Sequence, residues 1–430
     1  MKTTNNMKRL YQYILELARG GLFHIFGSSI LSQILSMVSA ILVIRFLPKA
    51  DYGNYAIAEN LYSYLAVFVG LGMSSAILQF CSEKIDDAKK HGIYLYALKK
   101  GSVCNAVLMV ATLLLALYKR ASGDAESGRY LALMCGLPFV AYLNEFVQIV
   151  QRVLNDNIIF SRLNIVYSIT AVTGNILFTR LWGVDGLIAA IYAANLVVTI
   201  LGSRNLKRKG FFDSLKYRET LGWDYRKEIT KYAVLCAATN FTSTMLVLLD
   251  VTCLDMVLEN PTVLADYKVA SAIPAACMFV PSALITYFYP KIVHNYSAEP
   301  DAFYGFIKKM TAMFTAVNGV ILVGLLLFAP LIVYIFYGEK YMNVVPIFRM
   351  LSLNFFIFGS TRKLFGNVIA AMKKSEVNLV FSLLTGIINI VLNLLILPVY
   401  GSIGAAIATV CVSLIIGLAS GSYLWKSLVC

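Results

Sequence analysis

Several ionisable residues, Asp255 among them, interrupt the long apolar stretches of this sequence, and seven of them are candidate site residues. The seven are Arg45, Glu59, Glu145, Asp250, Arg349, Arg362 and Lys363. If those stretches cross a membrane, each charge is costly unless it is paired or hydrated, so each marks a candidate functional site. Arginine and lysine bind anions, and carboxylates accept protons and cations. The chemistry that these residues offer is therefore ion binding and proton exchange inside a membrane.

Asp250 is the leading candidate among the carboxylates because it lies well inside an apolar stretch. We expect it to act as a coupling residue that exchanges a proton or holds a cation such as Na+. An ion pair with Arg362 or Lys363 is an alternative of equal weight. Glu145 and Glu59 have the same two alternatives, a coupling role or a structural ion pair.

The composition indicates an integral membrane protein. Hydrophobic residues make up 59% of the 430 residues, against about 45–50% in soluble domains. The 37 Lys and Arg exceed the 23 Asp and Glu, which gives a net charge of +14. In a membrane protein this excess reflects the orientation of loops, so we expect no nucleic-acid partner. The eight cysteines and three histidines show no metal-binding spacing, and we expect no metal and no cofactor beyond a coupling H+ or Na+.

Apolar runs of membrane-spanning length predict about twelve helices. The first six cover approximately Leu22–Leu47, Tyr55–Cys81, Ser102–Tyr118, Tyr130–Val150, Leu163–Thr179 and Gly186–Ser203. The second six cover approximately Tyr232–Leu258, Tyr267–Pro290, Met310–Tyr337, Val344–Met372, Val377–Pro398 and Ser402–Leu424. Loops assigned to one side hold 26 Lys and Arg, and those assigned to the other hold eight. The bias predicts an even number of spans with both termini in the cytoplasm.

The polar stretch 204–231 falls near the middle of the chain and predicts a linker. We therefore expect a first lobe of six spans in residues 1–203, a basic cytoplasmic linker in 204–231, and a second lobe of six spans in 232–430. The simplest interpretation of the linker is a solvated loop whose charge fixes topology or touches anionic headgroups. In the eighth span, Pro274 and Pro281 should bend the helix because each removes a helix hydrogen bond.

The two halves resemble each other in sequence, as in duplicated transporters. The segment Ala50-Asp51-Tyr52 recurs as Ala265-Asp266-Tyr267. The segment 164–168, Asn-Ile-Val-Tyr-Ser, recurs as Asn-Leu-Val-Phe-Ser in 378–382, and Gly183 and Gly186 recur as Gly401 and Gly404. Three collinear matches at offsets of about 215 predict an internal repeat. Because each half holds an even number of spans, the repeat should be parallel.

The chain resembles the polysaccharide and lipid-linked oligosaccharide flippases of the multidrug/oligosaccharidyl-lipid/polysaccharide exporter superfamily. The resemblance rests on the six-plus-six layout and on Asp250 in the seventh span. It also rests on the segment from Arg45 to Gly53 (Arg-Phe-Leu-Pro-Lys-Ala-Asp-Tyr-Gly) after the first span and on the segment Tyr400-Gly401-Ser-Ile-Gly404 that opens the last span. It implies an all-α membrane fold like that of the MATE exporters. Two pseudo-symmetric lobes of six helices would surround a central cavity.

The resemblance also implies a function. It is that of a multi-pass protein of the bacterial inner (cytoplasmic) membrane that moves an undecaprenyl-pyrophosphate-linked oligosaccharide to the periplasmic leaflet. The glycan would serve O-antigen, capsule or exopolysaccharide assembly, with the polymerase and glycosyltransferases of the pathway as partners beside the membrane lipids. The transporter would work by alternating access and would not be an enzyme.

A pyrophosphate headgroup needs cations that stay charged in a partly dry site, and the planar fork of arginine suits phosphate. Arg362 and Lys363 are the leading candidates, followed by Arg45 and Arg349. Adjacent helical residues point about 100° apart, so at most one of Arg362 and Lys363 faces the substrate directly. The alternatives for these two are an ion pair with Glu145 or Asp250, or contact with an anionic lipid.

Two other functions remain open on the sequence alone. A cation-coupled multidrug exporter of the same superfamily is the first, although the first span lacks an acidic residue in its body. A membrane enzyme that acts on lipid-linked sugars is the second. The predicted outward loops are short, and no nucleotide-binding or protease motif is present, which weighs against the enzyme.

Overall fold

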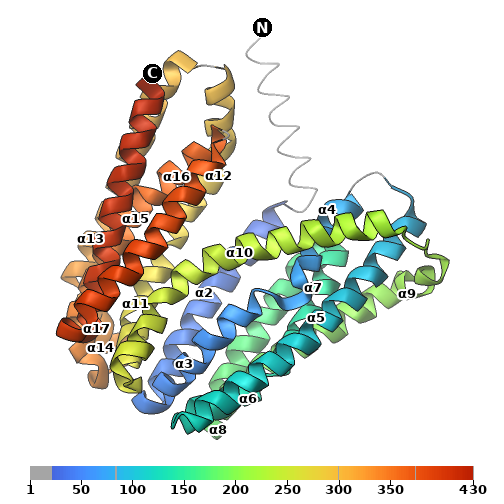
Figure 1. The fold of residues 1–430 in the computed structure, drawn as a ribbon, viewed down its shortest axis with the longest axis horizontal. Coiled ribbons are helices and arrows are strands. Elements are labelled where there is room, and N and C mark those ends of the chain that lie inside the picture. Colours follow the sequence, from blue (N-terminus) through green and yellow to red (C-terminus); the bar gives the residue numbers. More distant parts are fainter. Residues whose placement is uncertain (1–21, 83–84, 299, 373, 430) are drawn as a thin grey trace. The chain divides into compact units, whose positions relative to one another are not determined.

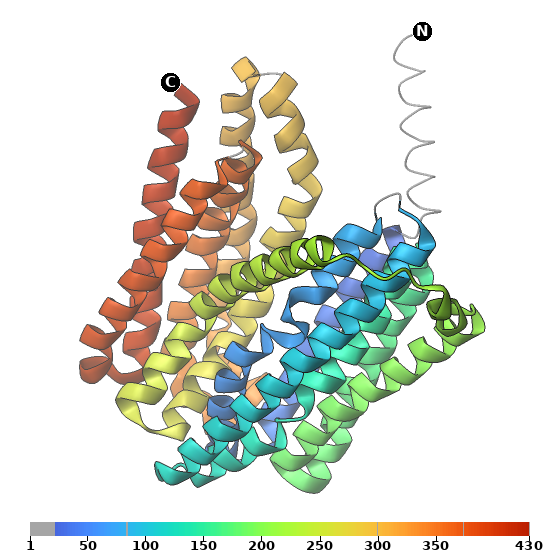
Figure 2. The ribbon, with the colours of Figure 1, turned by 45° about the vertical axis from the view of Figure 1, so that its right-hand side comes forward.

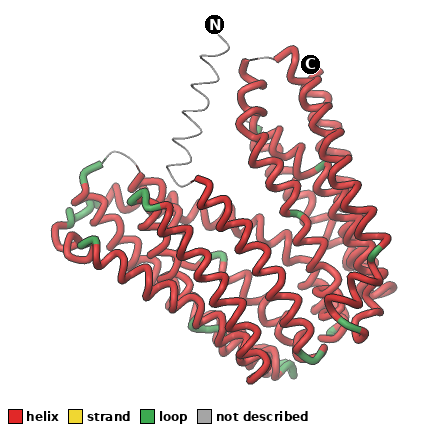
Figure 3. The backbone as a smooth tube through the Cα atoms, turned by 180° about the vertical axis from the view of Figure 1, so that it is seen from behind, coloured by secondary structure: helices red, strands yellow, loops and turns green. Residues whose placement is uncertain are grey.

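The computed structural model describes residues 22–82, 85–298, 300–372 and 374–429. Within these ranges the chain forms helices and short turns and contains no strand (Figure 3). In lipid a helix satisfies its own backbone N–H and C=O groups, so an apolar run of span length folds as a helix. The predicted all-α class is confirmed.

The chain divides into two compact units that are interleaved in sequence. Unit 1 comprises Leu61–Thr242 and the described residues up to Leu47, and unit 2 comprises Pro48–Asn60 and Ser243 onward. Two helices, α3 (Lys49–Ala66) and α10 (Trp223–Leu258), pass from one unit into the other. The linear boundaries expected at residues 204 and 231 stay a prediction.

The remaining elements belong to one unit each (Figure 1). Unit 1 holds α2 (Leu22–Phe46), η1 (Val69–Gly72), α4 (Met73–Ser82), α5 (Asp87–Ala121), α6 (Ala125–Leu133), α7 (Leu137–Val153), α8 (Asn157–Arg208), α9 (Phe211–Ser214) and η2 (Leu215–Tyr217). Unit 2 holds α11 (Pro261–Cys277), α12 (Phe279–Ala298), α13 (Pro300–Leu327), α14 (Ala329–Tyr337), η3 (Glu339–Val344), α15 (Val345–Ser360), α16 (Arg362–Ala371) and α17 (Ser375–Val429).

The described part of the chain has eight helical segments that are long and apolar enough to cross a membrane. Two of them, Asn157–Arg208 and Glu376–Leu428, contain 52 and 53 residues. A straight helix of 52 residues is about 78 Å long, more than twice the hydrocarbon thickness of a bilayer. Each of the two segments carries two of the predicted spans, and the total of twelve stays a prediction.

Both long helices reverse direction at a glycine. Gly183 in α8 has φ 60° and ψ −135°, and Gly401 in α17 has φ 59° and ψ −143°. A β-carbon on Gly404 would lie 2.9 Å from the carbonyl oxygen of Ile396, and one on Gly186 would clash with that of Phe178. In a straight helix, residues eight positions apart are about 12 Å apart, so the chain must fold back at both glycines. The two limbs of α17 meet at one end of unit 2 in Figure 2.

The same conformation at equivalent glycines confirms the internal repeat in structural terms. Gly183 and Gly401 differ by 8° or less in both dihedral angles. The two oxygens that approach the following glycines, on Phe178 and Ile396, also correspond at the offset of 218. The packing role of Gly186 and Gly404 follows from these contacts, since neither position has room for a side chain.

Several other predicted spans are interrupted, among them the eighth and the second. The eighth span divides at Met278, between α11 and α12, so the bend expected from Pro274 and Pro281 is confirmed. The second span breaks at Gly70, Leu71 and Gly72, which all have positive φ. The side-chain oxygen of Asn105 accepts a hydrogen bond of 2.9 Å from the freed backbone N–H of Gly70. This contact satisfies a backbone group that lipid could not.

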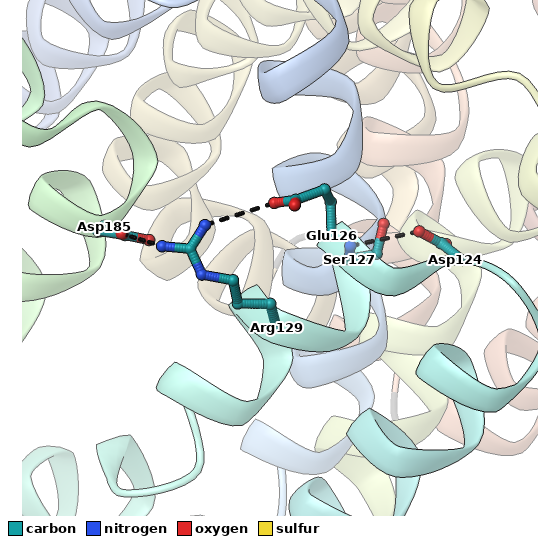
Figure 4. A network of polar contacts seen from close by, with 5 residues as sticks. All are labelled: Asp124, Glu126, Ser127, Arg129 and Asp185. Carbon is teal, nitrogen blue, oxygen red and sulfur yellow. Dashed lines mark hydrogen bonds and ion pairs between the residues drawn. The ribbon is translucent and has the colours of Figure 1, made fainter.

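Ion pairs fasten the ends of helices in unit 1. Arg129 in α6 pairs with Glu126 at 3.5 Å and with Asp185, beside the reversal of α8 (Figure 4). The Asp124 side chain accepts a hydrogen bond of 3.3 Å from the backbone N–H of Ser127 and caps α6. The network ties α6 to the turn of α8 and leaves its charged groups half exposed.

Candidate functional site

The structure places the seven predicted residues in both units. Arg45 and Glu145 belong to unit 1, and Glu59, Asp250, Arg349, Arg362 and Lys363 belong to unit 2. Two of the seven, Asp250 and Arg362, each sit at the centre of a dense group of side-chain hydrogen bonds. Both groups are built largely from α17.

Asp250, on α10, is surrounded by neutral donors. Its Oδ1 accepts hydrogen bonds from Nδ2 of Asn389 at 2.9 Å and of Asn393 at 3.1 Å. Its Oδ2 accepts hydrogen bonds from the hydroxyls of Tyr267 at 2.7 Å and Thr409 at 2.6 Å. We call these five residues the Asp250 cluster. All four carboxylate contacts come from uncharged groups.

The fold brings the cluster together from distant parts of the chain. Asn389 and Asn393 are four residues apart on the first limb of α17, so they share one helix face. Thr409 follows the reversal at Gly401 and approaches from the second limb, and Tyr267 comes from α11. The reversal of α17 therefore places both limbs against the same carboxylate.

The Asp250 cluster contains an oxygen without a partner. Oδ1 of Asn393 is buried and accepts no hydrogen bond. A buried polar atom of this kind costs about 1–3 kcal/mol unless a water, ion or other group satisfies it. The carboxylate, this amide oxygen and the Thr409 hydroxyl together form a set of oxygen ligands of the kind that hard cations prefer.

Arg362 begins α16, just after a break in the tenth span. Thr361 has φ −117° and ψ −82° between α15 and α16, and its hydroxyl donates to the carbonyl of Ile357 at 2.6 Å. A β-carbon on Gly417 would lie 2.5 Å from Thr361 Oγ1, so α17 packs tightly against the break. Arg362 therefore lies at the point where the helix of the tenth span is interrupted.

Neutral acceptors hold the Arg362 guanidinium. Nη1 donates to Oδ1 of Asn378 at 3.1 Å, and Nη2 donates to the Asn378 carbonyl at 3.3 Å and to Oγ of Ser382 at 3.2 Å. Nδ2 of Asn378 in turn donates to the carbonyl of Gly366 at 2.7 Å. A β-carbon on Gly366 would lie 2.6 Å from Nη1, so only glycine leaves room for this placement.

The structure does not join the two groups. Among the ion pairs of the described residues, none includes Asp250, Arg362 or Lys363. The pairing of Asp250 with Arg362 or Lys363 that the sequence left open is therefore not formed. The positive charge of Arg362 is not neutralised by a described carboxylate.

The other predicted residues take no part in the hydrogen bonds described for Asp250 and Arg362. Arg45, Glu145 and Arg349 are exposed, and Lys363 is half-buried next to Arg362. Glu59 forms an ion pair with Lys268 at 3.3 Å. Of the two roles considered for Glu59, this contact is the structural ion pair. A second ion pair joins Lys49 to Asp266 at 2.5 Å.

The two ion pairs belong to a contact region between residues 48–60 and the rest of unit 2. Nδ2 of Asn60 donates to the hydroxyl of Thr252 at 2.9 Å, and Asn343 donates to Asp266 at 2.7 Å. Gly53 packs so closely on Pro261 that a β-carbon would clash with the proline carbonyl. These contacts explain why the start of α3 groups with unit 2.

Sequence reasoning missed the partners of both charged residues. Asn389 and Asn393 were detectable as two amides four apart in an apolar run. Asn378 and Ser382 were noticed only as part of the repeat. Their contact with Arg362 depends on the packing of α16 against α17, which no local pattern reveals.

The repeat shows that the charge is specific to unit 2. At the offset of 214, Asn389 corresponds to Asn175, whose amide donates to the Ser39 hydroxyl at 2.8 Å. At the same offset Arg362 corresponds to Gln148, which donates to Asn144 at 2.8 Å. At this offset unit 1 has the neutral residues Gln148 and Ser36 where unit 2 has the charged residues Arg362 and Asp250.

Comparison with known proteins gives the family. Residues 18–296 match the family described as polysaccharide biosynthesis protein. Among curated proteins, none matches the chain at a significant level.

Solved structures give the fold. A multidrug resistance MATE family transporter of the MOP superfamily, in an inward-facing conformation, is 14% identical, with a TM-score of 0.76 over 92% of this chain and 95% of that chain. The lipid II flippase MurJ is 15% identical, with a TM-score of 0.74 over 94% and 87%. A MOP superfamily transporter from Pyrococcus furiosus is 14% identical, with a TM-score of 0.59 over 96% of each chain.

These matches are to transporters and a flippase, and none of the three is an enzyme. The family match covers more than half of the chain and the fold matches cover nearly all of it. The predicted MATE-like fold is confirmed. The chain belongs to the polysaccharide biosynthesis protein family and has the fold of the MOP superfamily transporters.

Proposed function

We propose that this protein is a flippase that moves a polyprenyl-pyrophosphate-linked oligosaccharide across the bacterial inner membrane, from the cytoplasmic to the periplasmic leaflet. The observation that carries the proposal is Arg362, a cation in a broken span whose hydrogen-bond acceptors are all neutral. Membership of the polysaccharide biosynthesis family supports it. The glycan would be a repeat unit of O-antigen, capsule or exopolysaccharide.

A guanidinium inside a membrane span is costly unless it is paired or hydrated, and this one has only neutral hydrogen-bond acceptors among the described residues. A pyrophosphate would supply the missing negative charge, and each charge-assisted hydrogen bond to it contributes about 1.5–3 kcal/mol. Lys363 lies next in the helix and adds a second cation about 100° away. Arg45 and Arg349 are exposed and would meet the headgroup at an earlier or later stage of transport.

The Asp250 cluster would couple transport to an ion. A proton on the carboxylate, or a Na+ held by Asp250, Asn393 Oδ1 and Thr409, would neutralise the charge and satisfy the buried amide oxygen. Either cation would change the hydrogen bonds between α10 and both limbs of α17. Binding and release of the ion would thereby alter the packing of these helices.

The predicted topology belongs to the same proposal. Both termini, the linker 204–231 and the other Lys- and Arg-rich loops would lie in the cytoplasm. The polymerase and the glycosyltransferases that make and consume the lipid-linked oligosaccharide would be the protein partners. A membrane-impermeant thiol reagent added to intact cells should not label a cysteine at the C-terminus. Labelling there would show that the protein has the opposite orientation in the membrane.

A multidrug exporter is the second candidate, favoured by one observation. The multidrug transporter noted above matches the fold with a TM-score of 0.76, and the Asp250 cluster would serve a cation-coupled exporter equally well. Arg362 weighs against it, because a cationic drug would be repelled by an unneutralised arginine.

Deletion of the gene in its host tests the proposal. We expect loss of a surface polysaccharide and accumulation of its polyprenyl-pyrophosphate-linked units on the cytoplasmic side. An intact surface glycan with new sensitivity to cationic drugs would replace the flippase by the multidrug exporter. A strain complemented with the wild-type gene controls for effects on neighbouring genes.

A further inference from the structure

The linker after α8 is folded, and it docks on the start of α5. The backbone N–H of Glu219 donates to the carbonyl of Ala88 at 2.9 Å. The ring of Phe211 is 5% exposed, and its centroid lies 5.3 Å from that of Tyr94. Gly92 makes room for this approach, since a β-carbon there would lie 2.5 Å from the carbonyl oxygen of Glu219. The solvated loop that the sequence suggested is therefore a fixed surface of unit 1.

Docking of the linker forces several aromatic rings outward. With Phe211 and Leu221 buried, Phe212, Tyr217 and Trp223 are 44%, 79% and 78% exposed. Tyrosine and tryptophan are enriched where a membrane meets water, because their rings suit the headgroup region.

The position of the linker in the chain places it near the headgroup region of the membrane. The apolar second limb of α8 ends at Lys207 and Arg208, and α10 begins at Trp223. Basic residues at the end of a span mark the headgroup region. The linker joins α8, which is long and apolar enough to cross a membrane, to the predicted seventh span, and it is pinned to α5, so we expect it near the surface of the bilayer.

The charge of the surface is positive. Residues 204–231 contain nine Lys and Arg and four Asp and Glu, a net charge of +5. Lys207, Arg208, Lys216 and Arg218 are exposed in the same stretch of the chain, and Lys216 lies 3.8 Å from Asp213 in an exposed ion pair. Each basic residue near an anionic membrane surface contributes about 1 kcal/mol of attraction.

We propose that Phe212, Tyr217, Trp223 and the four basic residues Lys207, Arg208, Lys216 and Arg218 form a binding surface for the headgroups of anionic phospholipids. We call it the aromatic-basic surface. The rings enter the headgroup region, and the ammonium and guanidinium groups bind the phosphates. The surface lies in unit 1, whereas Arg362 and Asp250 lie in unit 2, so this proposal does not depend on which substrate the protein moves.

The test uses the purified full-length protein in a neutral detergent with added lipid. Phosphatidylglycerol should raise the melting temperature of the wild type by several degrees more than phosphatidylcholine does. The triple variant Lys207→Gln/Lys216→Gln/Arg218→Gln should lose most of this difference. The variant Lys308→Gln/Lys309→Gln/Lys426→Gln, which removes three exposed charges from unit 2, should keep it.

Two further measurements keep the test decisive. Tyr217→Ser/Trp223→Ser changes no charge and should weaken retention of phosphatidylglycerol as measured by native mass spectrometry. High salt should reduce the lipid preference, since it screens exposed charges. Equal effects of the two lipids on the wild type would overturn the proposal, as would an unchanged preference in the triple variant. The proposal would also be overturned if the purified protein carried a bound partner protein and showed no preference between the two lipids. The surface would then be a site for a protein partner.

Discussion

At the scale of single residues, unit 2 separates two half-buried charges, Asp250 and Arg362, and gives each a shell of neutral partners. Asp250 accepts four hydrogen bonds and Arg362 donates three, and no described ion pair cancels either charge. A structural ion pair would have neutralised both. Separate, held charges are suited to binding ions of opposite sign that arrive and leave.

The first prediction concerns Asp250. Asp250→Asn removes the charge and faces an amide N–H toward groups that are already donors. We expect a loss of about 1–3 kcal/mol in the free energy of unfolding. We also expect transport that no longer depends on pH or Na+, whichever the wild type requires. Transport assays across pH and Na+ gradients measure the dependence.

The matched control for Asp250 is Asp224→Asn, an exposed carboxylate at the start of the same helix. It should keep the dependence of the wild type on the coupling ion. If Asp250→Asn kept that dependence as well, Asp250 would have a structural role only.

The second prediction concerns the placement of Arg362. Gly366→Ala puts a methyl group 2.6 Å from Nη1 and should displace the guanidinium from Asn378 without removing its charge. Because the flexible end of the arginine side chain can move, the melting temperature should hardly change. The apparent affinity for the substrate should fall several-fold in a concentration series of the transport assay.

Gly324→Ala, a glycine with nothing nearby, is the control and should leave affinity unchanged. An unaltered affinity in Gly366→Ala would show that the exact placement of the fork is unimportant.

The sequence was sufficient to find the charged residues but not their surroundings. Asp250, Arg362 and Lys363 were visible because charges are rare in apolar runs. Tyr267 and Asn378 lay within repeated segments, yet nothing local linked them to Asp250 or Arg362. Such links depend on which helices pack together, and side-chain hydrogen bonds across helices leave no periodic pattern.

At the scale of elements, discontinuities position the functional groups. The reversal at Gly401 brings Thr409 to Asp250, and the break at Thr361 exposes Arg362 at the start of α16. Repeated glycines and the two prolines of the eighth span were readable in the sequence. The break at Gly70-Leu71-Gly72 was not, because Leu71 adopts a positive φ that its residue type does not favour.

The third prediction concerns the reversals. Gly401→Ala forces a side chain into a backbone conformation that is almost confined to glycine, at a cost of about 1–3 kcal/mol. We expect a lower melting temperature in detergent, and the same for Gly183→Ala at the equivalent position. Gly305→Ala, in a helix and with open space around it, should be neutral or slightly stabilising. Equal melting temperatures for all three variants would mean that the reversals tolerate other residues.

At the scale of the whole molecule, a duplicated chain has kept its fold and lost its symmetry of charge. The reversals correspond closely in the two units, whereas at the offset of 214 Gln148 and Ser36 stand where unit 2 has Arg362 and Asp250. The internal repeat and the fold class were predictable because they rest on hydropathy and glycine spacing. The interleaved division at α3 and α10 was not, because it depends on contacts such as Lys49 with Asp266.

The most direct test of the central claim is a flipping assay in proteoliposomes. A polyprenyl-pyrophosphate-linked oligosaccharide is incorporated, and the fraction that an added glycosidase can reach is followed over time. With the wild type we expect nearly all of the substrate to become accessible. With Arg362→Gln only the share already in the outer leaflet should be cut, and Lys426→Gln should behave as the wild type. Two results would contradict the account. In the first, the fraction of substrate that the glycosidase reaches with the wild type stays at the level of protein-free vesicles. In the second, Arg362→Gln flips the substrate at the wild-type rate.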